Sequence, residues 1–333
     1  MLSTNINLIV MCGIPGSGKS FIAEKLKEKS KNNCKILSSD AYRKIMCGDE
    51  NCQDKNEEIF NALYKDLIIN LKLGYDVIFD ATNTTLKARR KILNQLSKCN
   101  KNIHKICYVV NTPIDICIER DKNRCRNVGE EVIQKFTKSF QMPHYFEGWD
   151  EIQIHNLPTK EIIDSNFNKM DGIISKMESF NQYNPHHKYT VGAHCRNMFN
   201  YFFERDDNMI RAMAGQFHDV GKLFTQHFDE YNIAHYYSHD SIGAYYMLCN
   251  LDLFLEEDKD IFLEMLFYIN YHMRAHYDFR NEKAYKKYSQ IFGKERLDNL
   301  LEFADADIIT SGTKDCHDEV IKNICNVEEN PWN

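Results

Sequence analysis

The chain has 333 residues, which is enough for two domains of ordinary size, each with its own hydrophobic core. Charged residues make up 27% of it and the apolar classes 43%, which is typical of a globular protein and excludes a disordered one. The formal net charge of −6 argues against a wholly basic nucleic-acid coat, although it permits a local basic groove.

Three further features predict a soluble protein in a reducing compartment. The 12 cysteines form no CxxC pair and no dense framework, so we expect free thiols. Residues 1–13 lack the basic segment and the cleavage site of a signal peptide. The best candidate for a membrane span, at 261–269, is far shorter than the ~20 residues required. We therefore expect a cytoplasmic protein with no membrane partner.

The first half of the chain alternates short apolar runs with longer segments of helical spacing. Strands are expected at 7–12, 34–39, 76–82 and 105–110, and helices at 19–31, 56–74 and 85–98. A last strand is expected within 147–156. This alternation predicts an α/β domain with a parallel sheet and helices on both faces.

The second half has a different pattern. Residues 157–180 are polar and loosely helical, 181–190 have turn composition, and the remainder has helical spacing with no evident strand. We therefore predict an α/β domain over residues 1–156, a linker with a connecting helix over 157–182, and an all-α domain over 183–333.

A phosphate-binding loop lies between the first strand and the first helix. The stretch GIPGSGKS, residues 13–20, fits GxxxxGK[ST] in the strand-loop-helix context that this motif requires. Gly13, Gly16 and Gly18 allow the backbone N–H groups, including that of Ser17, to point at phosphate oxygens. Lys19 would neutralise the β- and γ-phosphates, and Ser20 would bind Mg²⁺. The motif predicts ATP, or another nucleoside triphosphate, with Mg²⁺.

Candidate catalytic groups follow the later strands. Asp40 comes after the second strand and could accept a proton from an attacking hydroxyl, while Arg43, one helical turn later, could hold an acceptor phosphate. A helix-capping Asp and a surface Arg are the alternative. Asp80 follows the third strand and could contact Mg²⁺ through water. It is followed by Thr82 and Asn83, either of which could instead cap a helix.

Arginines of the stretch ERDKNRCR are the remaining candidates in this half. Arg120, Arg124 and Arg126 have near-helical spacing and could form a positively charged lid over the transferred phosphoryl group. A solvated charged face is the alternative.

Over about residues 5–155 these motifs resemble the P-loop polynucleotide kinases. The resemblance implies that Asp40 of the D-x-x-R element is the general base and that Arg43 contacts the acceptor phosphate. It also implies that the lid arginines are among Arg120, Arg124 and Arg126. The stretch MPHYFEGWDEI is similar to the closing strand of this group.

The second half contains a series of metal-ligand residue types within helical patterns. They are His194, His218, Asp219, His239, His272 and Asp305. Imidazole and carboxylate ligands of this mixture suit Mn²⁺, Fe²⁺, Co²⁺, Ni²⁺ or Zn²⁺, with a possible pair of metals about 3.5–4 Å apart. Metal-activated water would attack phosphorus, and Lys222 could steady the phosphate charge, unless it is a surface Lys.

Over about residues 183–312 this series resembles the HD superfamily of metal-dependent phosphohydrolases, and in particular the branch attached to tRNA nucleotidyltransferases. The resemblance implies that His194, His218, Asp219 and Asp305 are the ligands of the H…HD…D pattern. His239 and His272 match the extra ligands of multi-metal members. The stretch FADADI also contains Asp307, but the apolar residues before Asp305 favour Asp305.

Together the two resemblances predict an enzyme that heals nucleic-acid ends. A kinase would phosphorylate a 5′-hydroxyl, and a 2′,3′-cyclic phosphodiesterase or 3′-phosphatase would mend the other end. RNA is favoured over DNA because many nucleases leave RNA with these ends, and a separate ligase would then act. No stacking platform for bases is identified, since Tyr42, Tyr145, Phe146 and Trp149 are assigned to the core.

Two alternatives remain open. The first is a kinase of a nucleoside, a sugar or an antibiotic, fused to a nucleotide-cleaving HD module. The second is an HD half that only regulates the kinase. Arg43 distinguishes the first, because an acceptor without phosphate would not require it. Bound transition metal distinguishes the second.

Overall fold

A computed structural model of the protein describes residues 6–30, 32–50, 52, 54–99, 101–124, 127–155, 167–185, 187–206, 209–250 and 259–312. The chain divides into two compact units, Met1–Asn156 and Leu157–Asn333, which are described separately below. Among the helices in the described ranges, none is long and apolar enough to span a membrane.

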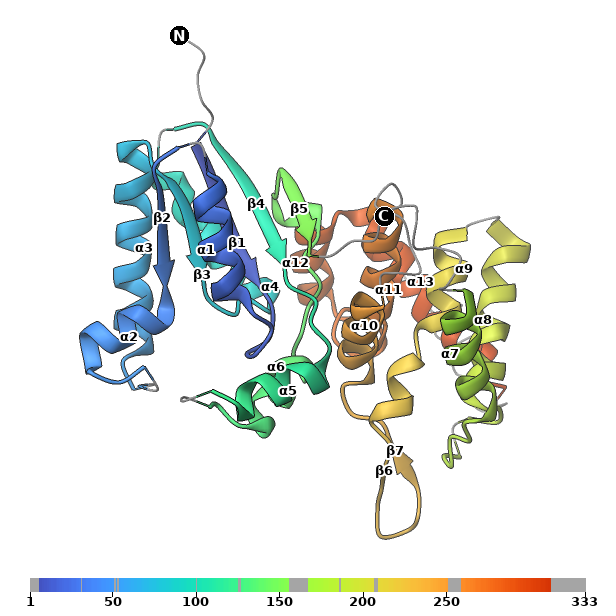
Figure 1. Cartoon of the computed structure of the whole chain (residues 1–333). Helices are drawn as coiled ribbons and strands as arrows, with labels where there is room; N and C mark the ends of the chain where they lie inside the picture. Colours follow the sequence, from blue (N-terminus) through green and yellow to red (C-terminus); the bar gives the residue numbers. More distant parts are fainter. Residues whose placement is uncertain are drawn as a thin grey trace. The chain divides into compact units, whose positions relative to one another are not determined.

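The N-terminal unit is built on a five-stranded parallel sheet (Figure 1). Its strands are β1 (Ile6–Cys12), β2 (Cys34–Ser38), β3 (Asp76–Asp80), β4 (Ile103–Val109) and β5 (Glu151–Ile154). Their order is β2-β3-β1-β4-β5. β3 is buried along its whole length, as expected for an inner strand of a sheet covered on both faces. The predicted α/β half with a parallel sheet is confirmed.

Helices alternate with these strands along the chain and connect them. They are α1 (Lys19–Lys29), α2 (Ser39–Cys47), α3 (Asn56–Leu73), α4 (Leu86–Gln95), η1 (Leu96–Lys98), α5 (Ile114–Lys122), α6 (Glu130–Lys138) and η2 (Tyr145–Glu147). Figure 1 shows α2, α5 and α6 beyond the carboxyl ends of the strands, the edge where ligands of open parallel sheets bind.

A fully buried ion pair fixes α4 against the segment before β5. The guanidinium of Arg89 donates from Nε and Nη2 to the two carboxylate oxygens of Glu147, at 2.8 and 2.7 Å. It also donates to the carbonyl oxygens of Asn83 and Gln141, at 3.1 and 2.8 Å. Burial opposes the charge of Arg89, but Glu147 raises its pKa above the ordinary value. The pair therefore joins the segment around Asn83 to the closing strand.

Replacing Glu147 with glutamine is expected to lower the free energy of unfolding by about 3–5 kcal/mol, because the buried guanidinium of Arg89 loses its counter-charge. Urea denaturation followed by circular dichroism measures this loss. The matched control is Glu130→Gln, since the Glu130 carboxylate lies 3.7 Å from Lys122 Nζ in an exposed pair. No measurable change is expected for it. Equal small losses in both variants would contradict a structural role for the buried pair.

The C-terminal unit is helical apart from one small hairpin. Its elements are α7 (Phe167–Ser179), α8 (Val191–Asp206), α9 (Met209–Phe217), η4 (Val220–Phe224), β6 (His227–Phe228), β7 (Ala234–His235), α10 (His239–Cys249), α11 (Lys259–Tyr277), α12 (Glu282–Phe292) and α13 (Lys294–Thr310). The prediction that the second half is helical is confirmed, and the antiparallel pair β6–β7, which Figure 1 shows as a loop projecting from the helices, is an addition that was not expected.

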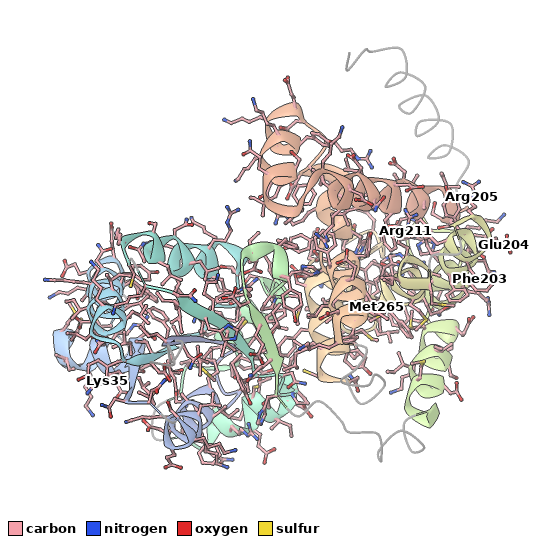
Figure 2. All side chains as sticks on the ribbon, turned by 90° about the horizontal axis from the view of Figure 1, so that it is seen from above. Lys35, Phe203, Glu204, Arg205, Arg211 and Met265 are labelled. Carbon is pink, nitrogen blue, oxygen red and sulfur yellow. The ribbon has the colours of Figure 1, made fainter. Side chains whose placement is uncertain are left out.

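The core of this unit surrounds α11. Its apolar residues are almost all buried, and aromatic rings of Phe267, Tyr271 and Phe292 lie 5.1–5.2 Å apart between centroids. At the edge of the core, Arg211 of α9 donates from Nη1 to Glu302 of α13 at 2.6 Å; Arg211 is labelled in Figure 2. The ring contacts join α11 to α12, and the Arg211–Glu302 contact joins α9 to α13.

A glycine of η4 permits a close approach of two backbone segments. A Cβ on Gly221 of η4 would collide with the carbonyl oxygen of His239, the first residue of α10. Only glycine allows such an approach of two backbones. The contact brings the segment that follows α9, with Asp219, next to the start of α10, with His239.

Candidate functional site

The phosphate-binding loop connects β1 to α1. Gly16 and Gly18 have φ values of 83° and 96°, which favour glycine. A Cβ on Gly16 would also collide with the carbonyl of Cys117 in α5. The N–H of Gly13 donates to the carbonyl of Thr82 at 2.9 Å, which joins the loop to the end of β3. The loop therefore has a conformation that depends on its glycines.

Two side chains at the start of α1 face the end of β3. The buried Lys19 curls back over the loop, and its Nζ donates to the carbonyl of Ile14 at 2.8 Å. Burial lowers the pKa of Lys19, and the nearby Asp80 opposes that shift. Ser20 Oγ donates to Asp80 Oδ2 at 2.8 Å. A hydroxyl and a carboxylate oxygen this close fit the hard-cation chemistry of Mg²⁺.

Asp80 is itself held in a low-polarity environment. Burial raises the pKa of its carboxyl group, while Ser20 and Lys19 act in the opposite direction. Asp40 raises it further and therefore lies within electrostatic range of this site. A cation at Ser20 and Asp80 would relieve the cost of the buried charge.

Asp40 lies in the first turn of α2 at the carboxyl edge of the sheet, and its side chain is 49% exposed. Its Oδ1 accepts from Arg43 Nη1 at 2.8 Å, while Arg43 Nη2 donates to Asn56 Oδ1 at 2.9 Å. The side chain of Arg43 is only 11% exposed. In this conformation the carboxylate of Asp40 is accessible from solvent, whereas the guanidinium of Arg43 is largely buried.

The remaining candidates of this half have different surroundings. Asn83 is buried with φ at 47°, and its Nδ2 donates to the carbonyl of Met11 at 2.8 Å. It therefore links the segment after β3 to the end of β1, just before the phosphate-binding loop. Arg120 Nη1 donates to the carbonyl of Ser17 at 3.2 Å and so lies at the phosphate-binding loop. Arg124 is exposed at the end of α5, and Arg126 lies outside the described residues.

The segment after α5 is fastened by one buried carboxylate. Asp121 accepts from the backbone N–H groups of Val128 and Gly129, at 3.0 and 2.9 Å from Oδ2. The chain that carries Arg124 is thus anchored at both ends, at α5 and at the start of α6. Sequence reasoning missed Asp121, because its role depends on backbone groups that only the fold brings to it.

A cluster of histidines and aspartates lies in the interior of the C-terminal unit. His194 of α8 places Nε2 2.8 Å from Asp307 Oδ1 of α13 and 3.2 Å from His218 Nε2. Asp219 Oδ1 lies 3.1 Å from His239 Nε2 and 4.0 Å from His272 Nε2. Three groups of three potential ligands result among the described residues, and one of them, Cys195–His218–Asp219, includes a thiol. The two groups made only of imidazoles and carboxylates are His194–His218–Asp307 and Asp219–His239–His272.

Asp219 joins the two groups. Its Oδ2 lies 3.5 Å from His218 Nε2 and 3.7 Å from His194 Nε2, while Oδ1 faces His239. One carboxylate with an oxygen on each side is the arrangement that a bridged pair of cations requires. All of these ligand residues are buried.

Backbone carbonyls fix the orientation of three of the imidazole rings. Nδ1 of His218, His239 and His272 lies 2.7–2.8 Å from the carbonyl oxygens of Gly215, Tyr236 and Ile269. A carbonyl oxygen only accepts, so Nδ1 carries the proton, and Nε2 of a neutral ring presents a lone pair to the cluster. The Nε2 atoms of His239 and His272 are 3.1 Å apart. Two lone pairs at this distance repel, so the geometry fits a cation between them.

Charge effects in the cluster agree with this interpretation. Burial lowers the pKa of His272 well below its usual value, and His239 adds to the effect, so this ring stays neutral. Burial also opposes a charge on His218, but the carboxylates of Asp219 and Asp307 raise its pKa well above the usual value. The carboxylates thus attract positive charge to the centre of the cluster.

The structure places Asp307, and not Asp305, in the cluster. Asp305 Oδ1 accepts from Arg280 Nη2 at 2.5 Å, at the rim of the bundle. The two residues are separated by about 200° around α13, so only one can face the other ligands. The predicted preference for Asp305 is corrected accordingly, and the ligand set that we propose contains Asp307.

Lys222 is buried and not at the surface. Its Nζ lies 2.7 Å from Asp219 Oδ2, donates to Gln182 Oε1 at 2.8 Å and lies 3.3 Å from His187 Nε2. Burial, followed by the charge of Lys222, lowers the pKa of His187 to about 3. His187 is therefore a neutral ring. Lys222 in this conformation orients Asp219, with Gln182 and His187 as its further partners.

His276 is a site residue that sequence reasoning missed. Its Nε2 lies 2.9 Å from Asp307 Oδ2, so it fixes the carboxylate whose other oxygen faces His194. A signal was present, because His276 follows His272 by four residues and must share its face of α11.

Asp307→Asn is expected to lower the metal affinity of the protein by about 10–100-fold or more. Loss of a residue that only supports a ligand has an effect of this size, and loss of a ligand should cost no less. Titration with Mn²⁺ or Ni²⁺ measures the affinity. Asp305→Asn, two residues away on the same helix, is the matched control and should retain it. Loss of affinity only in the Asp305 variant would restore the assignment made from the sequence.

Comparisons with known proteins assign the N-terminal half. Residues 8–143 match the AAA domain family. L-seryl-tRNA(Sec) kinase of Methanococcus maripaludis is 28% identical over 164 residues, which cover 48% of this chain and 62% of that protein. The N-terminal half is therefore a P-loop kinase domain. The match leaves more than a third of that relative uncovered.

Solved structures resemble the chain over a similar extent. A chain of the Pnkp1/Rnl/Hen1 RNA repair complex is 26% identical, with a TM-score of 0.35, over 40% of this chain and 43% of that chain. A gluconokinase from Sinorhizobium meliloti 1021 is 17% identical, with a TM-score of 0.32, over 44% of this chain and 81% of its own.

Proposed function

We propose that this protein heals RNA ends with two separate active sites. The N-terminal unit would transfer the γ-phosphoryl group of ATP to a 5′-hydroxyl. The C-terminal unit would hydrolyse a 2′,3′-cyclic phosphate or a 3′-phosphate with a divalent metal, as an HD-type phosphohydrolase. The observation that carries the proposal is that one chain combines a complete phosphate-binding loop with a buried cluster of paired metal-ligand groups.

In the kinase reaction the acceptor oxygen attacks the γ-phosphorus and ADP leaves. Lys19 and the loop N–H groups hold the phosphates, and Ser20 and Asp80 would hold Mg²⁺, which neutralises the transferred charge. Asp40 takes the proton of the attacking hydroxyl, for which its exposed carboxylate at the edge of the sheet is suited. Arg120, next to Ser17, adds positive charge beside the loop.

In the hydrolytic reaction the ligand residues are set before substrate arrives. Three rings are oriented by backbone carbonyls, Asp307 by His276, and Asp219 by Lys222. Divalent metals held there would supply a Lewis acid and lower the pKa of water. Because these five ligands are held from outside the cluster, little reorganisation of them is needed on binding.

A nucleic-acid acceptor is supported by two features. The D-x-x-R element of Asp40 and Arg43 resembles that of polynucleotide kinases, and the relative from Methanococcus maripaludis is named for an RNA-borne substrate, L-seryl-tRNA(Sec). RNA would be favoured over DNA because RNA cleavage leaves the 2′,3′-cyclic phosphate that the second site would remove. A separate ligase would then join the healed ends.

One observation favours a second candidate. Each Nη atom of Arg43 already has a partner within the protein, Asp40 for Nη1 and Asn56 for Nη2, so the guanidinium has a structural role that does not depend on an acceptor phosphate. A kinase of a nucleoside, sugar or antibiotic, fused to a nucleotide-cleaving or regulatory module, would have this arrangement. Arg43→Ala would then raise the KM for an acceptor to the same extent whether or not the acceptor carries a phosphate.

The test is an RNA oligonucleotide with a 5′-hydroxyl and a 2′,3′-cyclic phosphate, incubated with ATP, Mg²⁺ and Mn²⁺. Mass spectrometry reads both ends of the product. We expect gain of a 5′-phosphate and, independently, opening or removal of the cyclic phosphate. If ATP is hydrolysed while both ends stay unchanged, the RNA proposal is wrong and the small-molecule acceptor replaces it.

A further inference from the structure

Exposed aromatic rings gather around the β6–β7 hairpin of the C-terminal unit. Tyr183, Phe228, Tyr231 and Tyr237 are 58, 40, 76 and 70% exposed. The rings of Tyr183 and Phe228 lie 5.7 Å apart between centroids, and Tyr237 stacks on His235 at 5.8 Å with an interplanar angle of 5°. These four exposed rings are called the hairpin platform below. Exposing the apolar faces of these rings to water is unfavourable in free energy, and a partner that covers them would remove this cost.

The hairpin that carries these rings is fastened to the bundle. The N–H of Ala234 donates to the carbonyl of Tyr183 at 2.9 Å, and Asn184 Nδ2 donates to the carbonyl of Ala234 at 2.8 Å. At the tip, Asp229 Oδ1 accepts from the N–H groups of Tyr231 and Ile233, both at 2.9 Å. The platform is therefore a built surface with a defined backbone.

Of the two acidic residues at the tip, Glu230 is exposed, whereas the carboxylate of Asp229 makes contacts within the turn. Asp229 Oδ2 lies 2.9 Å from His235 Nε2, and both backbone contacts go to its other oxygen. His235 and these N–H groups lower the pKa of Asp229.

The platform is continuous with the metal-ligand cluster. Tyr236, between His235 and Tyr237, donates its hydroxyl to the carbonyl of Gln182 at 2.6 Å, and Gln182 Oε1 accepts from Lys222, the partner of Asp219. Tyr237 also precedes the ligand His239 by two residues, so their Cα atoms are within about 8 Å. A group that covers Tyr237 therefore lies close in the chain to the ligand His239.

We propose that the hairpin platform stacks the unpaired bases next to the 3′-terminal phosphate of an RNA strand. The inference rests on the proposed function and adds the part of the substrate that the cluster itself does not contact. Bases have planar apolar faces and stack on Tyr and Phe rings regardless of sequence. Bases also fit separate rings on a narrow hairpin, whereas a protein partner needs one contiguous apolar patch.

The experiment uses the full-length protein, and binding is measured separately from turnover. The probe is a short RNA with a 3′-phosphorothioate and 2-aminopurine as the last base, whose fluorescence falls on stacking. Wild type is compared with the double variant Tyr231→Ala, Tyr237→Ala. The matched control is Phe203→Ala, since Phe203 is 45% exposed on α8 (labelled in Figure 2), nine residues and about 13 Å beyond His194.

We expect wild type and the Phe203 variant to quench the fluorescence, and the double variant to bind at least about fivefold more weakly with the quench lost. Hydrolysis of bis(p-nitrophenyl) phosphate, which has no base, reports on the metal centre alone. If all three proteins bind and quench alike, or if wild type does not quench, the platform is overturned. Quenching without any phosphoester hydrolysis would instead overturn the reaction proposed for the cluster.

Discussion

Asp219→Asn is expected to lower hydrolysis of a 2′,3′-cyclic phosphate by more than about 100-fold, and to remove bound metal from the C-terminal unit. The variant keeps the size of the side chain and removes its charge. Asp219 faces both groups of ligands, with His239 at 3.1 Å on one side and His218 at 3.5 Å on the other. The Asp219 substitution is therefore expected to weaken metal binding at both groups of ligands, whereas Asp307→Asn is expected to weaken it at one.

Metal content by elemental analysis and hydrolysis by mass spectrometry measure this result in the same samples. Asp240→Asn is the matched control, because Asp240 is also a buried aspartate, adjacent to His239, but belongs to neither ligand group. The proposed kinase activity of the Asp219 variant should be unchanged, since its residues lie in the other unit, and far-UV circular dichroism checks that the C-terminal helices are retained. Full metal content in Asp219→Asn would contradict a bridging carboxylate.

The parallel sheet could be predicted because its signal is local. Inner strands such as β3 are short uninterrupted apolar runs, and helical spacing between them leaves few topologies. The β6–β7 hairpin could not be predicted, because each of its strands has two residues and shows no periodicity. Its backbone is instead held by Tyr183 and Asn184, which lie about 50 residues earlier in the chain.

The choice between Asp305 and Asp307 shows what sequence spacing leaves open. Both are carboxylates on one helix with similar apolar neighbours, and the sequence does not say which side of α13 faces α8. That side is decided by packing, through the contacts of Asp307 with His194 and His276 and of Asp305 with Arg280. Residue type was predictable here, and direction was not.

Arg43 shows the same distinction in the N-terminal unit. Its spacing from Asp40 predicts a shared helix face, and the structure places the two side chains in contact at 2.8 Å. The sequence does not reveal which residue turns Arg43 inward. The structure shows that it is Asn56, at the start of the next helix. A motif carried over from a family therefore fixes which residues meet, while the surrounding fold decides which of them reaches the substrate.

Asp40→Asn is expected to lower the kcat of phosphoryl transfer by about 10²–10⁴-fold, the usual contribution of a general base. ATP binding should change little, because in the proposed mechanism the phosphates would be held by Lys19, Ser20 and the loop N–H groups and not by Asp40. Transfer from ATP to a 5′-hydroxyl RNA under saturating conditions measures kcat. Nucleotide affinity is measured separately by calorimetry with a non-hydrolysable ATP analogue.

The matched control is Asp49→Asn, an exposed aspartate just beyond the end of α2, which should keep the wild-type kcat. A pH profile separates general-base catalysis from a purely structural effect. If a carboxylate is the general base, kcat of the wild type should fall at low pH, whereas the residual rate of Asp40→Asn should lack that step. If both proteins show the same acidic limb, the base is another group at the carboxyl edge of the sheet. Asp80 would then be the next residue to test, because its carboxylate is buried beside Lys19 and burial raises its pKa.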